Sequence, residues 1–238
     1  MLEHIQLQNL LVLDIETVSQ KKNFESLDED WQELWARKSG ALNNPETNPA
    51  KNYDRAAIYA EFGKIVCIGV GIFHLVDGEY HLKVKSFHGD DEKQILLDFT
   101  DLLNTSFSEP RHLLAAHNGK EFDFPYLCRR MLINGINIPK ILDISGKKPW
   151  EVQHVDTMEL WKFGDYKNFT SLNVLAKCFD IPSPKDDIDG SMVGHTYWQQ
   201  GDIERIATYC KKDIITTARL ILKFKLQPLL PDARIIVK

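Results

Sequence analysis

Two carboxylates, Asp14 and Glu16, interrupt the apolar run of residues 9–18 near the start of the chain. The aliphatic and β-branched residues of this run favour a buried strand. Residues two apart in a strand share a face, so both carboxylates would project together, about 6.6 Å apart along the chain. Burying two like charges without a partner is costly. The pair therefore indicates either a Mg²⁺ or Mn²⁺ ion between hard oxygen ligands, or an exposed strand edge whose acids pair with lysines.

A third carboxylate, Asp123, follows the apolar run 112–117, which we expect to be a strand, and the polar turn 118–120. The end of a strand is where α/β folds commonly place their sites. Asp123 is also suited to cap the helix that we expect over about 124–134, which has a proline in its first turn. Taken alone, Asp123 favours the capping role.

Tyr209 and Asp213 are four residues apart in the amphipathic segment 202–224, so they lie on one face of the expected last helix. In isolation, they are typical of a surface acid beside a half-buried tyrosine. Together with the three acids above they become informative. Four carboxylates on three elements, with a tyrosine one turn away, are the ligand set that two divalent ions about 3.5–4 Å apart need for phosphodiester hydrolysis.

The order and spacing of these residues resemble the three motifs of the DEDD superfamily of 3′–5′ exonucleases. The matching segments are Asp14-Ile-Glu16-Thr17, Asn118-Gly-Lys-Glu-Phe122-Asp123 and Tyr209-Cys-Lys-Lys-Asp213. The histidine branch would place His five residues before the last Asp, where this chain has Thr208. The sequence is therefore similar to the tyrosine branch (DEDDy). Within it, Tyr53-Asp-Arg, Glu61-Phe-Gly-Lys and Asp189-Gly-Ser extend the likeness to the stand-alone predicted exonucleases related to the proofreading domain of family B DNA polymerases.

This resemblance implies a ribonuclease H-like α/β fold, a mixed sheet flanked by helices. It implies that two divalent ions, Mg²⁺ or Mn²⁺, are held by four ligands: Asp14, Glu16, Asp123 and Asp213. Tyr209 would orient the attacking water, because a phenol with an ordinary pKa near about 10 is a poor base at neutral pH. Thr17 and Asn118 would contact the terminal nucleotide, and Phe122 would either pack beneath the site or stack on a base.

The expected activity is metal-dependent hydrolysis at the 3′ end of single-stranded DNA, which releases nucleoside 5′-monophosphates. An exoribonuclease acting on RNA stays open, because the choice depends on how a pocket treats the 2′-hydroxyl. A nucleic-acid-binding adaptor that keeps the fold without catalysis is the alternative of another class, although all four acids and the tyrosine are present. A nucleotide-binding enzyme is not indicated, since Asn118-Gly-Lys120 lacks the spacing of a phosphate loop.

The segments that must position these residues are predicted to form an α/β sheet. Beyond the first strand we expect strands over 64–75 and 80–88, joined by a hairpin at Asp77-Gly78. Amphipathic patterns predict helices over 90–104 and 169–179. The first three strands should be neighbours, with helices packed against the sheet.

We expect one domain over residues 1–238, with an inserted helix and loop at about 19–62. A second irregular stretch, 182–195, is rich in Pro, Asp and Gly and predicts a mobile surface loop. The four cysteines, with neither a Cys-x-x-Cys pair nor zinc-finger spacing, predict buried free thiols.

The 238 residues are 43% hydrophobic and 26% charged, proportions typical of a soluble globular protein. The formal net charge of −5 argues against a broadly basic, duplex-coating surface. A local site that binds nucleic acid through metal ions is compatible with that charge. We see no run long enough to span a membrane and no signal peptide, so we expect a cytoplasmic protein without a membrane partner.

Overall fold

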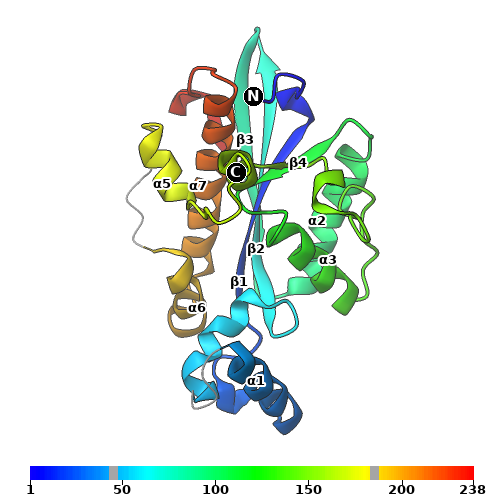
Figure 1. The fold of residues 1–238 in the computed structure, drawn as a ribbon, viewed down its shortest axis with the longest axis vertical. Helices are drawn as coiled ribbons and strands as arrows, with labels where there is room; N and C mark the ends of the chain where they lie inside the picture. Colours follow the sequence, from blue (N-terminus) through cyan, green and yellow to red (C-terminus); the bar gives the residue numbers. More distant parts are fainter. Residues whose placement is uncertain (43–47, 183–187) are drawn as a thin grey trace.

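The computed structural model describes residues 1–42, 48–182 and 188–238. Its six strands form one mixed sheet in the order β5-β4-β1-β2-β3-β6 (Figure 1). The strands are β1 (Leu10–Ser19), β2 (Gly63–Val76), β3 (Glu79–His88), β4 (Leu113–Ala116), β5 (Val155–Asp156) and β6 (Ile235–Val237). The expected α/β sheet is confirmed, and β1, β2 and β3 are neighbours as predicted.

The strand that carries Asp14 and Glu16 lies in the middle of this sheet. β1 pairs with β2 in antiparallel fashion, with Asp14 opposite Gly69 and Glu16 opposite Cys67, and its first residues pair with β4 in parallel. The two acids therefore do not lie on an edge strand, so the exposed-edge alternative is wrong. The predicted hairpin joins β2 to β3, and the positive φ angles of Asp77 (50°) and Gly78 (81°) fit a tight two-residue turn.

Helices cover both faces of the sheet (Figure 1). One face packs against α2 (Glu92–Ser106) and α3 (Asp123–Ile133), and the other against α5 (Leu172–Cys178) and α7 (Ile203–Phe224). Odd-numbered side chains of β1, such as Leu13, join the first core and even-numbered ones, such as Val12, join the second. By this alternation Asp14 and Glu16 face α7. The remaining helices are α4 (Thr157–Lys162) and α6 (Val193–His195) and, beyond the sheet, α1 (Glu29–Leu42).

Two glycines let α7 lie close to the sheet. A Cβ atom on Gly69 would stand 2.6 Å from Cys210 Sγ, and one on Gly71 would stand 2.6 Å from Ile214 Cγ2. Neither distance is tolerable for a real side chain. The helix backbone can therefore approach β2 at this point, which brings the residues of α7 next to Asp14.

The insertion between β1 and β2 forms a separate aromatic cluster at the end of the sheet where α1 lies (Figure 1). Helix α1 and the 3₁₀ segment η3 (Pro49–Ile58) pack through Trp35 and Tyr53, whose ring centroids are 5.8 Å apart. Trp35 Nε1 also donates to the carbonyl oxygen of Pro49 at 3.0 Å. The predicted inserted helix is confirmed, and residues 43–47 of the predicted loop lie outside the described residues.

The prediction of a loop over 182–195 is wrong in its described C-terminal part, while residues 183–187 lie outside the described residues. The chain forms a 3₁₀ turn at η5 (Gly190–Met192), continues into α6 and ends in the π-helical turn η6 (Thr196–Gln200). Asp189 caps this helical stretch by accepting from Ser191 N at 2.8 Å. Asp189 was therefore a helix-start signal rather than a loop signal.

Two smaller expectations also change. Cys67 and Cys210 are buried as expected, whereas Cys128 is half-buried and Cys178 is exposed at the end of α5. The short strand β6 was not predicted, because a strand of three residues carries no usable periodicity. Among the residues that the structure describes, no helix combines the length and apolar character needed to cross a membrane.

Candidate active site

The fold brings all four predicted acids to one place. Asp14 and Glu16 come from β1, Asp123 from the first residue of α3, and Asp213 from the middle of α7. Burial raises the pKa of Asp14 well above its usual range, and the charges of Asp123 and Asp213 raise it further. The pKa of Glu16 is raised in the same way, by burial first and then by Asp14. These mutual effects are expected only for carboxylates that are close together.

The position of Asp123 in the sequence suggested a helix cap, but in the structure Asp123 does not cap a helix. Helix α3 begins at Asp123 itself, and the preceding residue, Phe122, makes no side-chain cap. Asp123 Oδ1 instead accepts a hydrogen bond from the backbone N–H of Ile15 on β1 at 3.0 Å. This bond ties α3 to the strand between the two acids of β1. Burial raises the pKa of Asp123 to about 7, although hydrogen bonds from backbone N–H groups act in the opposite direction.

The donor set fits divalent metal ions. Glu16 and Asp123 are only 7% and 3% exposed. Among the residues that the structure describes, Asp14, Glu16 and Asp123 form no ion pair with lysine or arginine, and Glu16 has no hydrogen-bond partner either. Buried carboxylates in this state are expensive unless a cation compensates them. Because all donors are hard oxygens, Mg²⁺ and Mn²⁺ suit the site.

Tyr209 and Cys210 complete the α7 side of the site. The hydroxyl of Tyr209 hydrogen-bonds Asp213, and burial followed by the charges of Asp213 and Glu16 raises the pKa of Tyr209 far above its usual value. The phenol is therefore a hydrogen-bond donor at neutral pH. Cys210 Sγ lies 3.4 Å from Asp14 Oδ2. Ligand atoms of Asp14, Glu16 and Cys210 all lie within 4.8 Å of one another, a proximity of the thiol that the sequence did not reveal.

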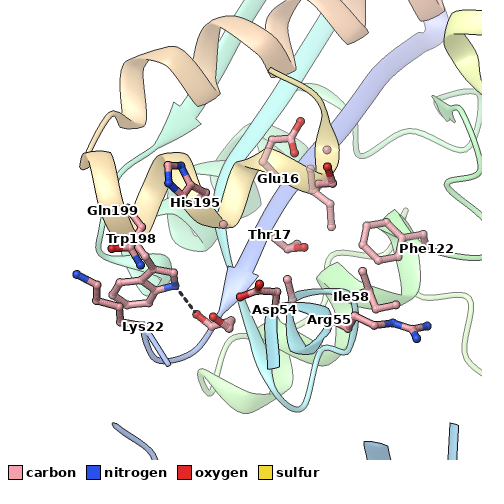
Figure 2. Close-up of a pocket in the computed structure, with 16 residues that line it drawn as sticks. Glu16, Thr17, Lys22, Asp54, Arg55, Ile58, Phe122, His195, Trp198 and Gln199 are labelled. Atoms are coloured by element: carbon pink, nitrogen blue, oxygen red, sulfur yellow. Dashed lines mark hydrogen bonds between the residues drawn. The ribbon is translucent and has the colours of Figure 1, made fainter. Parts of the chain in front are cut away.

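A pocket of about 580 Å³ opens beside Glu16 (Figure 2). Of the predicted substrate-binding residues, Thr17 and Phe122 line it, whereas Asn118 does not. Its volume falls in the range of about 300–1,000 Å³ that is usual for small-molecule sites. The lining residues from the turn after β1 and from η3, η5, α6 and η6 were not predicted as site residues, and they include Lys22, Asp54, Arg55, His195, Trp198 and Gln199.

The pocket walls come from segments that lie far apart in the sequence. Asp54 and Arg55 belong to the insertion, His195 is the last residue of the stretch expected to be a loop, and Trp198 follows it in η6 (Figure 2). Trp198 Nε1 donates to the carbonyl oxygen of Ser19 at 3.2 Å, which fastens this stretch to the end of β1. The likenesses at Tyr53-Asp-Arg and Asp189-Gly-Ser were the sequence signals that pointed to these walls, since Asp54, Arg55, Gly190 and Ser191 line the pocket.

Asn118 has a different place, at the end of β4. It adopts a left-handed backbone conformation (φ 66°), which asparagine tolerates better than most residues. Its backbone N–H donates to Asp156 Oδ1 and that of Lys120 donates to Asp156 Oδ2, both at 3.0 Å. Asp156 also accepts from Met158 N at 3.0 Å and thus caps α4. Asp156 therefore shapes the loop that leads to Asp123.

Comparison with solved structures shows the fold. A family B DNA polymerase from the hyperthermophilic archaeon Pyrobaculum calidifontis matches with a TM-score of 0.55 and 16% identity over 90% of this chain. The chain spans only 24% of the length of that polymerase. The RNase domain of the yeast Pop2 protein matches with a TM-score of 0.44 and 12% identity, over 96% of this chain and 81% of that domain. The expected ribonuclease H-like α/β fold, a mixed sheet flanked by helices, is confirmed.

Comparison with protein families gives the assignment. No curated protein matches the chain significantly. Residues 58–228 match the family described as "Predicted 3'-5' exonuclease related to the exonuclease domain of PolB". The matched region contains Asp123, Tyr209 and Asp213, while Asp14 and Glu16 precede it. Because the match covers more than half of the chain, this protein belongs to that family of predicted exonucleases related to the PolB exonuclease domain.

Proposed function

We propose that the protein is a metal-dependent 3′–5′ exonuclease that hydrolyses single-stranded DNA and releases nucleoside 5′-monophosphates. One observation carries the proposal: four carboxylates from three separate elements lie close enough to raise one another's pKa, beside a pocket of about 580 Å³. A structural role for these acids would call for basic partners. Among the described residues, no lysine or arginine forms an ion pair with Asp14, Glu16 or Asp123.

Asp14, Glu16, Asp123 and Asp213 are the proposed ligands of two divalent ions, Mg²⁺ or Mn²⁺. Bound there, the two ions would activate the attacking water, stabilise the leaving 3′-oxygen and offset the charge of the scissile phosphate. The protein supplies fixed positions for the ligands. Asp123 is held against β1 by the N–H of Ile15, and the glycines of β2 allow α7 to place Asp213 nearby.

Tyr209 is proposed to orient the attacking water. Its raised pKa keeps the phenol protonated at neutral pH, so the hydroxyl can donate a hydrogen bond but cannot serve as a base. Its bond to Asp213 links it to a proposed metal ligand. The lone pair of the same hydroxyl is then available to accept a hydrogen bond from water.

The pocket beside Glu16 is the proposed site of the 3′-terminal nucleotide. Thr17 offers a hydroxyl and a backbone group next to the acids, and Phe122 offers the face of a ring (Figure 2). We propose that Phe122 stacks on the terminal base or sugar, because it is half-buried at the pocket wall. Asn118 is proposed to contact the strand from the end of β4, outside the pocket. A small metal-centred site of this kind is compatible with the formal net charge of −5.

The test is time-resolved cleavage of matched 5′-labelled single-stranded DNA and RNA by the full chain, with Mg²⁺, with Mn²⁺ and with chelator. We expect a ladder that shortens from the 3′ end, requires metal and is faster on DNA. Asp14→Asn should reduce the rate at least about a hundredfold, because a positioned charged group commonly contributes that much. Asp101→Asn, an exposed acid on α2, is the matched control and should cleave normally.

Three outcomes would change the assignment. Faster cleavage of RNA would make the protein an exoribonuclease, and short 5′-labelled fragments that appear before the strand has shortened stepwise from its 3′ end would exclude an exonuclease. Binding of either strand without metal-dependent cleavage would identify a non-catalytic adaptor.

A further inference from the structure

Three large aromatic side chains crowd a short surface segment outside the pocket. Phe163, Tyr166 and Phe169 are 76%, 83% and 64% exposed. Aromatic rings contribute most when they are covered, so three rings left exposed within the segment 163–169 indicate a surface that binds something. We call these three side chains the aromatic platform.

The segment is held in one shape by its own backbone. Phe163 follows α4 in the left-handed conformation (φ 44°), which is unfavourable for a bulky residue, and Gly164 continues in it (φ 88°). The N–H of Asp165 donates to the carbonyl oxygen of Lys162 at 2.8 Å, and the N–H of Lys167 donates to Asp165 Oδ1 at 3.2 Å. The exposure of Phe163 thus comes with a strained but internally bonded turn, as found at functional sites.

Positive charge accompanies the rings. Lys162 Nζ lies 4.1 Å from the centroid of the Phe169 ring, within cation–π distance, although this side chain is only 9% exposed and forms an ion pair with Glu121. Lys167 is exposed between Tyr166 and Phe169. The one acid of residues 162–169, Asp165, is engaged by the backbone of its own turn. Exposed rings beside an exposed lysine, here Lys167, are the combination with which proteins bind single strands, because rings stack on bases and lysines attract phosphates.

Both ends of this region are fixed to the active-site loop. The His117 ring hydrogen-bonds Thr157 Oγ1 at 2.9 Å with one nitrogen and the carbonyl oxygen of Thr170 at 3.0 Å with the other. His117 is the residue at which β4 passes into the loop that ends at Asp123. The residues between Thr157 and Thr170 therefore start and finish beside that loop.

The loop separates the pocket from the aromatic platform. Phe122 lines the pocket, while its neighbour Glu121 faces the other way, with Oε1 3.6 Å from Lys162 Nζ. If the terminal nucleotide occupies the pocket, the nucleotides that precede it must leave the acids in a different direction. We propose that they cross this loop, and that the bases upstream of the scissile phosphate stack on Phe163, Tyr166 and Phe169. The inference rests on the proposed function and names a second binding region for its substrate.

The experiment separates this region from catalysis. Binding of 5′-labelled oligothymidylates of two and twelve nucleotides is measured by fluorescence anisotropy in chelator, so that no strand is cut. Cleavage is measured in Mg²⁺ with the p-nitrophenyl ester of thymidine 5′-monophosphate, whose single nucleotide cannot reach the platform. We expect each of Phe163→Ala, Tyr166→Ala and Phe169→Ala to weaken twelve-nucleotide binding about tenfold. Cleavage of the ester should stay within about twofold of wild type.

Two controls distinguish stacking from a general loss of surface. Tyr166→Phe keeps a ring and should bind the twelve-nucleotide strand like the wild type. Leu132→Ala removes an exposed apolar side chain from α3, 65% exposed, and should change neither measurement. Circular dichroism of each variant checks that it is folded.

The inference is overturned if the folded triple variant binds the twelve-nucleotide strand as tightly as wild type, or if wild type binds no strand. Loss of self-association by the variants with unchanged strand binding would assign the rings to a contact between copies of the chain. If wild type cleaves neither substrate but binds the long strand through the rings, the proposed exonuclease activity fails while this inference stands.

Discussion

Two buried groups of charges in the described part of the chain are treated in opposite ways: the protein itself neutralises the first, but not the second. Glu92 and Arg130 are both buried and form a double hydrogen bond, with Arg130 Nε 2.9 Å from Oε1 and Nη2 2.6 Å from Oε2. Arg130 Nη1 also donates to the carbonyl oxygen of Ala60, while Ile65 N and Asn134 Nδ2 donate to Glu92. The donors and acceptors of this pair are thus matched within the core.

The acids around Asp14 are the opposite case. Glu16 is equally buried, yet its nearest charges are other carboxylates, which raise its pKa. A buried ion pair with matched hydrogen bonds is typical of a structural contact, whereas like charges crowded together are typical of a binding site for a cation. The Glu92–Arg130 pair therefore stabilises the fold, whereas the acids around Asp14 are arranged to bind a cation.

The largest expected effect concerns the neutralised pair. Arg130→Met should lower the free energy of unfolding by about 3–5 kcal/mol, because it leaves Glu92 buried and charged. Urea denaturation measures this loss. Adding Glu92→Gln to the same variant should restore part of the stability, since the amide keeps an acceptor for Ile65 N. Arg37→Met, at an exposed ion pair, is the control and should cost at most about 1 kcal/mol. An Arg130→Met protein as stable as wild type would show that the pair is not structural.

The next effect concerns the acid cluster and its chemistry. Tyr209→Phe should lower kcat about ten- to a hundredfold with little change in KM, because the water loses an orienting group while the metal ligands stay. Steady-state cleavage of single-stranded DNA in Mg²⁺ measures it. Tyr59→Phe in the insertion is the matched control. An unchanged kcat would remove Tyr209 from the mechanism.

A substitution in the acid cluster should also change stability, but in the opposite direction to Arg130→Met. It should raise the free energy of unfolding. Asp14→Asn should stabilise the metal-free protein by about 1–2 kcal/mol, because it removes one of several repelling buried charges. Thermal unfolding in chelator measures the gain. Mg²⁺ should then stabilise wild type and not the variant, since a ligand that binds only the folded state raises its stability. Asp101→Asn should stay within about 0.5 kcal/mol of wild type under both conditions.

The smallest effect is a pH dependence of the metal-free protein. Carboxyl groups with a raised pKa bind more protons in the folded than in the unfolded state, so stability falls as the pH rises through the folded pKa. With the pKa of Asp123 at about 7 against an ordinary value of 3.8, its contribution to stability should fall between about pH 4 and 7, by at most about 1.4 kcal/mol per pH unit for each proton, and level off above about pH 8. Over much of the same range His154, whose pKa burial lowers from 6.5 to about 4, acts in the opposite direction, because its contribution is lost as the pH falls, so the net slope is small. Urea denaturation at several pH values measures the slope, and a slope that Mg²⁺ leaves unchanged would contradict this origin.

The acids were predictable from the sequence because their chemistry is local. Asp14 and Glu16 share a face by strand periodicity, and Tyr209 and Asp213 share one by helix periodicity. The role of Asp123 needed the structure, since its helix-start position favours a cap until the N–H of Ile15 is seen to be its partner. The same limit applies to Gly69 and Gly71. Their meaning depends on which element packs over them, and the strand pattern alone does not contain that information.

The chain by itself therefore determined the types of residue, the faces on which they lie and the order of the main elements, because periodicity and turn chemistry act over a few residues. The tertiary structure alone decided that His195 and Trp198 close a pocket with Asp54 of the insertion. It also decided that Glu92 is neutralised while Glu16 is not. Both outcomes depend on contacts between segments far apart in the sequence, where packing and desolvation, rather than local propensity, set the free energy.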